Sequence, residues 1–223
     1  MDTRPTIIFD LDGTLADTIH DLVPCINRVI QPQNLAPVST QQIGPGSGKG
    51  VRSMIELAYA INNKPLPQQL LTELISEFME DYWHNICVDT EMYEGTQTVL
   101  KQFGANNWLL GVCTNKPIDM AEKLLHELGI KSLFSSITGA DSFEFRKPDP
   151  RHLLKTIELA GGTPERAIMI GDSQTDILTA QNANVPVVAV DFGYSEEPVA
   201  TFNPDIVISH YSQLFAAVST LVK

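Results

Sequence analysis

The sequence predicts an α/β fold in which a mostly parallel sheet is wrapped by helices and a separate helical module is inserted after the first strand. Two observations carry this prediction. Short apolar runs alternate with amphipathic helical patterns along most of the 223 residues, which is typical of a parallel sheet with crossover helices. Between residues 17 and 90, by contrast, only helical patterns occur.

The expected strands are short and apolar. TIIF, directly before Asp10, is the first, and the others are LLGVC (109–113), SSIT (135–138), AIMI (167–170), VPVVAV (185–190) and DIVI (205–208). Helices are expected between them. One places Ala121, Leu124, Leu125 and Leu128 on a single face, and another is PRHLLKTIELAGG, which its two glycines close.

Three apolar stripes with helical spacing predict three helices in the inserted segment. They are Ile19, Leu22, Val23, Ile26 and Ile30; Val51, Met54, Ile55, Ala58 and Ile61; and Leu70, Leu71, Leu74, Ile75 and Phe78. Pro24 either kinks the first helix or marks its start. A strand-free block of this length indicates a small module of its own.

Composition excludes several classes of function. The net charge of −12 argues against a nucleic-acid partner, which clustered Lys and Arg would bind, and against an anionic membrane surface. Three widely spaced cysteines form neither a CxxC pair nor a disulfide framework. The N-terminus lacks the apolar run of a signal peptide, and no run has the length of a transmembrane helix. We therefore expect a cytoplasmic protein.

Four polar clusters follow predicted strands. DLDGT (10–14), TNK (114–116) and GDSQTD (171–176) come directly after a strand, and RKPDP (146–150) lies in the loop after SSIT. In open parallel sheets, ligands bind beyond the carboxyl ends of the strands. The four clusters are therefore expected to converge on one pocket.

The contents of these clusters suit phosphoryl transfer with magnesium. Asp10, Asp12 and Asp172 supply the hard oxygen ligands that Mg²⁺ prefers. Asp176 lies four residues after Asp172 at a helix start, so that it can face the same ion, directly or through water.

The remaining groups suit the phosphate itself. Thr114 and Asn115 offer a hydroxyl and an amide to its oxygens, and Lys147 neutralises a phosphate held close to an aspartate. Hydrolysis of phosphate monoesters is among the slowest uncatalysed reactions, and concentrated positive charge is what it requires.

The stretch GPGSGKG (44–50) looks at first like a nucleotide-binding P-loop. In the pattern G-x-x-x-x-G-K-[ST], however, the first glycine would fall on Ile43, and Gly50 stands where Ser or Thr should follow Lys49. The segment before it, APVSTQQ, is polar rather than a strand. We predict instead a flexible glycine loop that opens a helix.

Together, FDLDGTLADT, VCTNK, RKPDP and IGDSQTDI resemble the four motifs of the haloacid dehalogenase superfamily, over nearly the whole chain. Within it, MYEGTQTVL, NVPVVAV and DFGY are most similar to the phosphoglycolate phosphatases. The resemblance implies a Rossmann-like, doubly wound core formed by residues 1–16 and 91–223, with a helical cap domain at 17–90. It also implies a phosphatase that hydrolyses a small phosphorylated metabolite, with 2-phosphoglycolate as the expected substrate.

The resemblance also implies roles for single residues. Asp10 would be the nucleophile that becomes an aspartyl phosphate, and Asp12 the general acid and then base. Mg²⁺ would bridge Asp10 and the phosphate, with Asp172 and the backbone oxygen of Asp12 as further ligands. Lys147 and Thr114 would stabilise transition-state charge. Lys49 or Arg52, on the glycine loop of the cap, would meet a substrate carboxylate, unless that loop only opens the cap helix.

Several alternatives stay open. A phosphatase of the same superfamily could act on another small phosphoester or on pyrophosphate. A β-phosphoglucomutase-like sugar-phosphate mutase would carry a histidine where Leu22 stands. A receiver-like regulatory phospho-acceptor domain also pairs aspartates with Thr and Lys, but it is a compact module without a helical insert. The sequence is compatible with a monomer or a homodimer.

Overall fold

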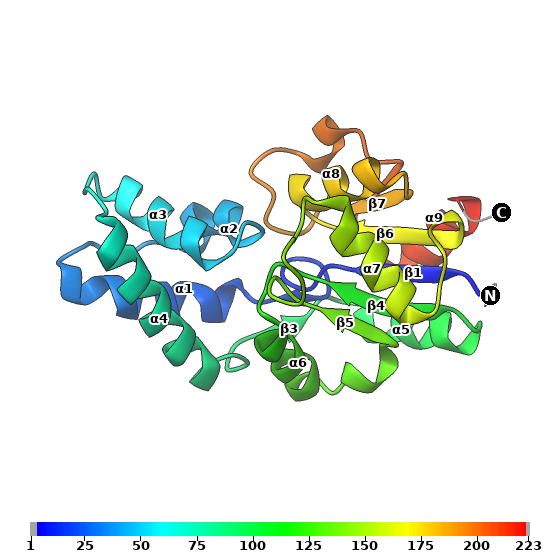
Figure 1. The fold of residues 1–223 in the computed structure, drawn as a ribbon, viewed down its shortest axis with the longest axis horizontal. Coiled ribbons are helices and arrows are strands. Elements are labelled where there is room, and N and C mark those ends of the chain that lie inside the picture. The colour runs from blue at the N-terminus through cyan, green and yellow to red at the C-terminus, as the bar shows by residue number, and fades with distance from the viewer. Residues whose placement is uncertain (1–3, 222–223) are drawn as a thin grey trace.

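The computed structural model of the chain describes residues 4–221. Its centre is a six-stranded sheet with the order β5-β4-β1-β6-β7-β8, in which every neighbouring pair is parallel (Figure 1). The predicted α/β class is confirmed. The strands are β1 Thr6–Phe9, β4 Leu109–Cys113, β5 Ser136–Thr138, β6 Ala167–Gly171, β7 Val187–Val190 and β8 Ile206–Ile208.

Strand β1 lies where the chain order reverses. It pairs with β4 on one side and β6 on the other, with Thr6 opposite both Leu109 and Ala167. From there β4 leads outward to β5, whereas β6 leads outward to β7 and β8. A reversal of this kind leaves a crevice beyond the carboxyl ends of the strands. Asp10, which directly follows β1, stands at this crevice.

Helices cover both faces of the sheet, because successive strand residues point to opposite sides. Ile8 of β1 belongs to the core beneath α7 (Pro150–Ala160) and α8 (Gln174–Ala183). Ile7 and Phe9 belong to the core on the other face, which α5 (Thr96–Ala105) and α9 (Leu214–Leu221) cover. Helix α6 (Ile118–Glu127) packs beside β5. The doubly wound arrangement is therefore confirmed.

Four α-helices between β1 and β4 stand apart from the sheet: α1 Ile19–Ile30, α2 Thr40–Ser47, α3 Val51–Ile61 and α4 Gln68–His84 (Figure 1). They pack on one another around buried apolar side chains such as Ile26, Ile55 and Phe78. No helix in residues 4–221 is long and apolar enough to cross a membrane.

The chain passes from the sheet to these helices and back through two connecting segments, which pair in a short antiparallel ladder. The ladder pairs β2 (Ala16–Asp17) with β3 (Glu91–Met92). The sequence pattern misses both strands, because two residues are too few for any periodicity. The ladder lies at the predicted boundaries after residues 16 and 90, and the division into two domains stays a prediction.

Two local expectations need correction. Helix α1 begins at Ile19, so Pro24 lies inside it and does not mark its start. The first part of GPGSGKG is not a loop, because α2 continues through Ser47 and only Gly48, Lys49 and Gly50 connect it to α3. A capping box begins α2, in which Ser39 Oγ accepts from the amide of Gln42 (3.4 Å) and Gln42 Oε1 accepts from the amide of Ser39 (2.9 Å).

Candidate active site

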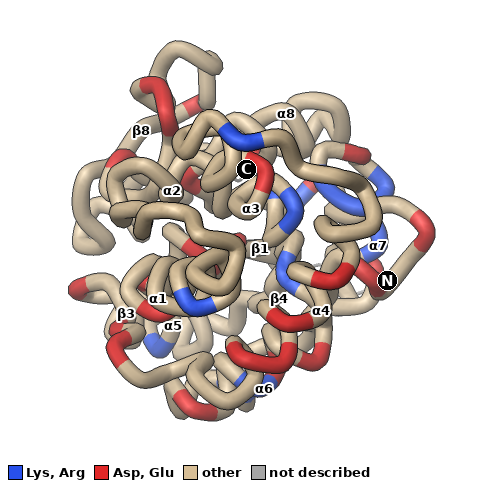
Figure 2. The backbone as a smooth tube through the Cα atoms, turned by 90° about the vertical axis from the view of Figure 1, so that its left-hand side faces the viewer, with Lys and Arg blue, Asp and Glu red and all other residues tan. Residues whose placement is uncertain are grey.

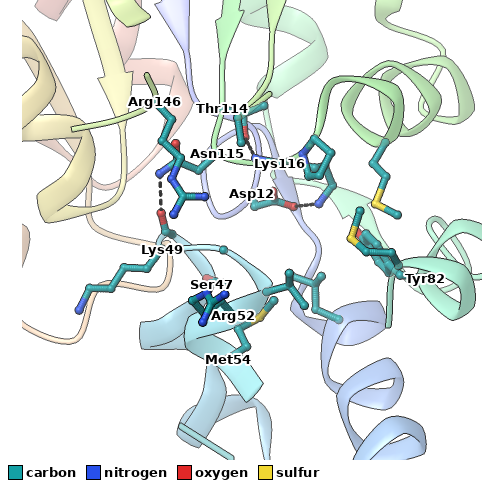
Figure 3. A pocket seen from close by; sticks show the side chains of 18 of the residues that line it. Asp12, Ser47, Lys49, Arg52, Met54, Tyr82, Thr114, Asn115, Lys116 and Arg146 are labelled. Carbon is teal, nitrogen blue, oxygen red and sulfur yellow. Dashed lines mark hydrogen bonds and ion pairs between the residues drawn. The ribbon is translucent and has the colours of Figure 1, made fainter. Parts of the chain in front are cut away.

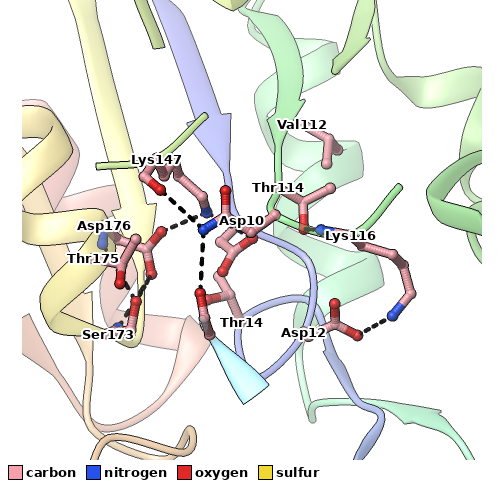
Figure 4. Close-up of polar contacts among 12 residues, drawn as sticks. Asp10, Asp12, Thr14, Val112, Thr114, Lys116, Lys147, Ser173, Thr175 and Asp176 are labelled. Atoms are coloured by element: carbon pink, nitrogen blue, oxygen red, sulfur yellow. Dashed lines mark hydrogen bonds and ion pairs between the residues drawn. The ribbon is translucent and has the colours of Figure 1, made fainter. Parts of the chain in front are cut away.

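The polar clusters that follow β1, β4 and β6 meet at one edge of the sheet, together with the loop that precedes α7 (Figure 4). Asp10, Thr114 and Asp172 each stand directly after a parallel strand. Because the carboxyl ends of these strands lie side by side in the sheet, their first polar residues become neighbours. Lys147 enters the same place from the loop between β5 and α7.

Three buried carboxylates lie close together. Oxygens of Asp10, Asp172 and Asp176 all lie within 4.8 Å of one another, and the three residues are at most 4% exposed. Burial, followed by the charge of Asp176, raises the pKa of Asp10 above its ordinary value, against the opposing effect of Lys147. Burial, followed by Asp176 and then Asp10, likewise raises the pKa of Asp172. The cluster therefore favours an added cation.

Lys147 is the cation within this cluster. Its Nζ lies 2.9 Å from Asp10 Oδ1 and 2.6 Å from Asp176 Oδ1, and its side chain is 1% exposed. Burial alone would lower the pKa of Lys147, but the two carboxylates outweigh it and raise that pKa. Since the cluster contains three carboxylates and this one ammonium, it carries excess negative charge when all three are ionised.

Asp172 is oriented by its surroundings. Its Oδ1 accepts a hydrogen bond from Thr14 Oγ1 (3.0 Å), and its Oδ2 accepts one from the amide of Tyr194 (2.8 Å). A side chain at either Gly13 or Gly193 would collide with the carboxylate. Glycine at these two positions therefore permits the backbone to approach Asp172 closely from two sides.

Asp176 is held in a different way. Its Oδ1 accepts from Lys147 Nζ, and its Oδ2 accepts from the amide (3.2 Å) and the hydroxyl (2.6 Å) of Ser173, which caps α8. Both oxygens are thus engaged by the protein. Asp176 stands beside the other two carboxylates as predicted, but its contacts position Lys147 and the start of α8.

Asp12 turns away from the three carboxylates. Its Oδ1 accepts from Lys116 Nζ (2.6 Å; Figure 4) and from Thr18 Oγ1 (2.7 Å), and Asp12 lines the cavity described below. The Asp12 carboxylate is thus engaged by Lys116 and Thr18 at the cavity. Its roles in proton transfer and in metal binding stay predictions.

Lys116 is a site residue that the sequence reasoning missed. It is 7% exposed, and its ammonium lies over the ring of Tyr82 from α4, 4.8 Å from the ring centre. Its backbone amide donates to Thr114 Oγ1 (3.1 Å). The available signal was the third letter of TNK, a lysine directly after two predicted phosphate ligands.

Asn115 joins the helices to the sheet. Its Nδ2 donates to the carbonyl oxygens of Gly48 (3.3 Å) and Lys147 (3.2 Å). The loop between α2 and α3 is thus attached to the site by this amide. That Asn115 binds phosphate stays a prediction, and its N–H groups are used here to fasten the loop.

A cavity of about 230 Å³ lies between the helices and the sheet, with Asp10 and Asp12 in its wall (Figure 3). Apolar side chains, among them Leu22, Met54, Ile75, Met79 and Met120, form much of the lining. Arg52 lines it too, with its guanidinium 3.6 Å from Glu56. Lys49 belongs to the rim, but its side chain is exposed and points away from the cavity in Figure 3.

Comparison with known proteins agrees with this geometry. The family profile described as haloacid dehalogenase-like hydrolase matches residues 7–190. The chain belongs to this family. The resemblance seen in the four motifs is therefore confirmed.

Relatives in this hydrolase family are similar over nearly their full length. A phosphoglycolate phosphatase of Mesorhizobium japonicum is 44% identical over 212 residues, which are 95% of this chain and 93% of that protein. One of Agrobacterium fabrum is 42% identical, over 96% of this chain and 91% of that protein. A crystal structure titled as a predicted phosphoglycolate phosphatase from Haemophilus somnus superposes with a TM-score of 0.90 at 28% identity, covering 97% and 99% of the two chains. The prediction of an enzyme is confirmed, and the chain is a phosphatase of the haloacid dehalogenase-like family.

Proposed function

We propose that this phosphatase hydrolyses a small phosphate monoester through an aspartyl phosphate at Asp10, with Mg²⁺ as its cofactor. The observation that carries the proposal is the buried arrangement of Asp10, Asp172 and Asp176 around the single ammonium of Lys147. Such an excess of buried negative charge is stabilised by a bound cation. A phosphoryl group next to Asp10 requires the same compensation.

The residues present fit Mg²⁺. Asp10 and Asp172 offer hard carboxylate oxygens. The backbone at Gly13 and Gly193 approaches Asp172 so closely that any side chain at these two positions would collide with its carboxylate. We assign the ion to Asp10, Asp172 and the backbone oxygen of Asp12, with Asp176 contributing through water. When bound, the ion supplies positive charge to the phosphoryl oxygens and reduces their repulsion from Asp10.

The chain's own residues would carry two half-reactions. A carboxylate oxygen of Asp10 forms a bond to phosphorus while the bond from phosphorus to the leaving oxygen breaks, and Asp12 gives its proton to that oxygen. Water then attacks phosphorus and gives a proton to Asp12, and the bond between phosphorus and Asp10 breaks. Lys147 lies against Asp10 at 2.9 Å and stabilises the added charge in both steps.

For the substrate we propose 2-phosphoglycolate, because the full-length relatives carry the name phosphoglycolate phosphatase. A mutase is less favoured, since the cavity wall has the apolar Leu22 where such an enzyme would carry a histidine. A receiver-like domain has no substrate cavity, whereas here helices enclose one over Asp10. Other small phosphoesters and pyrophosphate remain the alternatives to test.

We further propose that residues 17–90 act as a cap that covers the substrate. The contact of Asn115 with Gly48 supports this, as does the position of Tyr82, from α4, over Lys116. A closed cap excludes water and completes the binding site. Of the two cap cations predicted to meet a substrate carboxylate, Arg52 lines the cavity and Lys49 points outward, so Arg52 is the better placed.

The test is a panel of phosphate esters assayed with Mg²⁺ and with excess chelator. The panel contains 2-phosphoglycolate, β-glucose 1-phosphate, pyrophosphate and an alkyl phosphate that has no carboxylate. We expect phosphate release from 2-phosphoglycolate only with Mg²⁺, and none from the Asp10→Asn variant. Full activity in chelator contradicts the role of the metal, and preference for another ester contradicts the substrate. The predicted cytoplasmic location and the oligomeric state stay predictions.

A further inference from the structure

We infer that Arg146 binds a second anionic group on the substrate and so makes the site selective for acidic esters, in which a carboxylate lies close to the phosphate. This inference rests on the proposed phosphatase function and adds a residue to it. Arg146 stands in RKPDP, directly before Lys147, and no part of the reaction described above uses it.

The position of Arg146 places its charge in the substrate cavity. It lines the same cavity as Asp10 and Asp12, and its side chain is directed inward beside Asn115 (Figure 3). Its neighbour Lys147 contacts Asp10 at 2.9 Å. One short loop therefore supplies one cation where the phosphoryl group reacts and another at the adjoining wall.

The other cations that line the cavity, Lys49 apart, lie near carboxylates of the chain itself. Lys116 is paired with Asp12 at 2.6 Å, and Arg52 lies 3.6 Å from Glu56. Among the described residues that line the cavity, only Arg146 and Lys49 have a cationic group without an ion pair or a side-chain hydrogen bond. Since Lys49 points away, Arg146 is the available cation that faces the cavity.

The two carboxylates nearest in sequence, Glu144 and Asp149, form no ion pair with Arg146 among the described contacts. Asp149 instead binds Arg151, with 2.6 Å between its Oδ2 and Nη2, and its pKa is lowered by that guanidinium. In a chain with a net charge of −12, an arginine left without a carboxylate partner at the active site is available for an anionic ligand.

The chemistry of guanidinium identifies the ligand class. Its planar fork binds a carboxylate through two parallel hydrogen bonds, which a lysine ammonium cannot reproduce. In a 2-phosphoglycolate-like ester, only one oxygen and one methylene separate phosphorus from the carboxyl carbon. Adjacent residues can therefore hold both ends, with Lys147 at the phosphoryl group and Arg146 at the carboxylate.

The experiment compares two esters of nearly equal size, 2-phosphoglycolate and 2-hydroxyethyl phosphate, whose alcohol replaces the carboxylate. For Arg146→Ala we expect kcat/KM on 2-phosphoglycolate to fall about 10- to 100-fold, the usual effect of losing a charge-assisted contact. The value on 2-hydroxyethyl phosphate should change less than about threefold, because the phosphoryl contacts remain. Arg146→Lys should recover only part of the loss.

Arg151→Ala is the matched control, since it removes a nearby arginine, at the start of α7, that is already paired and outside the cavity lining. It should leave both esters unaffected. Equal losses on the two esters in Arg146→Ala overturn the inference, and so does selectivity that disappears in Arg52→Ala or Lys49→Ala instead. If the wild-type enzyme hydrolyses only 2-hydroxyethyl phosphate, the inferred selectivity for acidic esters is wrong, while the proposed phosphatase activity is confirmed. If it hydrolyses no phosphate ester at all, the proposed function itself fails.

Discussion

Replacing Lys147 by methionine should destabilise the metal-free protein strongly. The side chain is 1% exposed and contacts Asp176 at 2.6 Å and Asp10 at 2.9 Å, so its removal leaves buried carboxylates without their cation. Breaking a buried ion pair from one side costs about 3–5 kcal/mol. In a chain of 223 residues, each kcal/mol lowers the melting temperature by about 2–4 °C, so we expect a decrease of about 6–20 °C.

The assay is thermal unfolding in chelator, with two further variants. Lys155→Met is the matched control, because Lys155 lies 2.7 Å from Glu158 but is 51% exposed, and its loss should cost less than about 1 kcal/mol. The double variant Lys147→Met/Asp176→Asn should regain much of the stability, since it removes a buried negative charge together with the positive one. Activity should stay absent in both Lys147 variants. A double variant as unstable as the single one would refute the reasoning about buried charge.

Three further predictions concern the same site. Asp10→Asn should abolish turnover in the ester assay while its melting temperature in chelator is kept or raised, because one of the repelling carboxylates becomes neutral. Burial raises the folded-state pKa of Asp10 and Asp172, so they favour folding most below pH 4 and progressively less as the pH rises toward neutrality. Melting temperatures in chelator should therefore fall over that range and fall less with Mg²⁺; a flat profile would contradict these shifts. The Tyr194 hydroxyl donates to Asp17 Oδ1 (2.6 Å) and accepts from the amide of Ile19 (3.0 Å), at the start of the proposed cap, so we expect it to position the cap. Tyr194→Phe should therefore decrease kcat while the melting temperature changes little, and an unchanged kcat would contradict this role.

The sequence allowed prediction of those features that depend on local periodicity and on strand ends. The apolar runs predicted the strands of the sheet, and the residues directly after them, Asp10, Thr114 and Asp172, do meet at one edge. The strands could be predicted because a hydrophobic pattern depends only on neighbouring residues. The meeting of the residues that follow them could be predicted because parallel strands bring their carboxyl ends together.

Side-chain direction beyond a turn could not be predicted in this way. Asp12 is two residues from Asp10 yet contacts Lys116 and Thr18, because β1 ends at Phe9 and the chain then turns, with the amide of Leu15 donating to the carbonyl of Leu11 (2.9 Å). Contacts between distant loops were also missed. The amide of Tyr194 reaches Asp172 from the loop after β7, a contact between residues 22 positions apart that no periodicity encodes.

Proline and glycine content misled the prediction for GPGSGKG. These residues lower helix propensity, but α2 passes through Pro45 and ends after Ser47. The capping box at Ser39 begins the helix, and Ile43 and Gly44 are buried within the fold. Tertiary packing outweighed the local preference there, whereas Gly50, with a φ of +93°, does occupy a backbone position that favours glycine.

Chemical trapping of the intermediate tests the central claim most directly. A turnover reaction with 2-phosphoglycolate and Mg²⁺ is quenched early and treated with borohydride, which reduces an aspartyl phosphate to homoserine. Mass spectrometry of the peptide that contains residues 4–28 should then find homoserine at position 10, dependent on substrate and absent from the Asp10→Asn variant. Phosphate release with unmodified Asp10 at every quench time, or reduction at another carboxylate instead, would contradict the proposed mechanism.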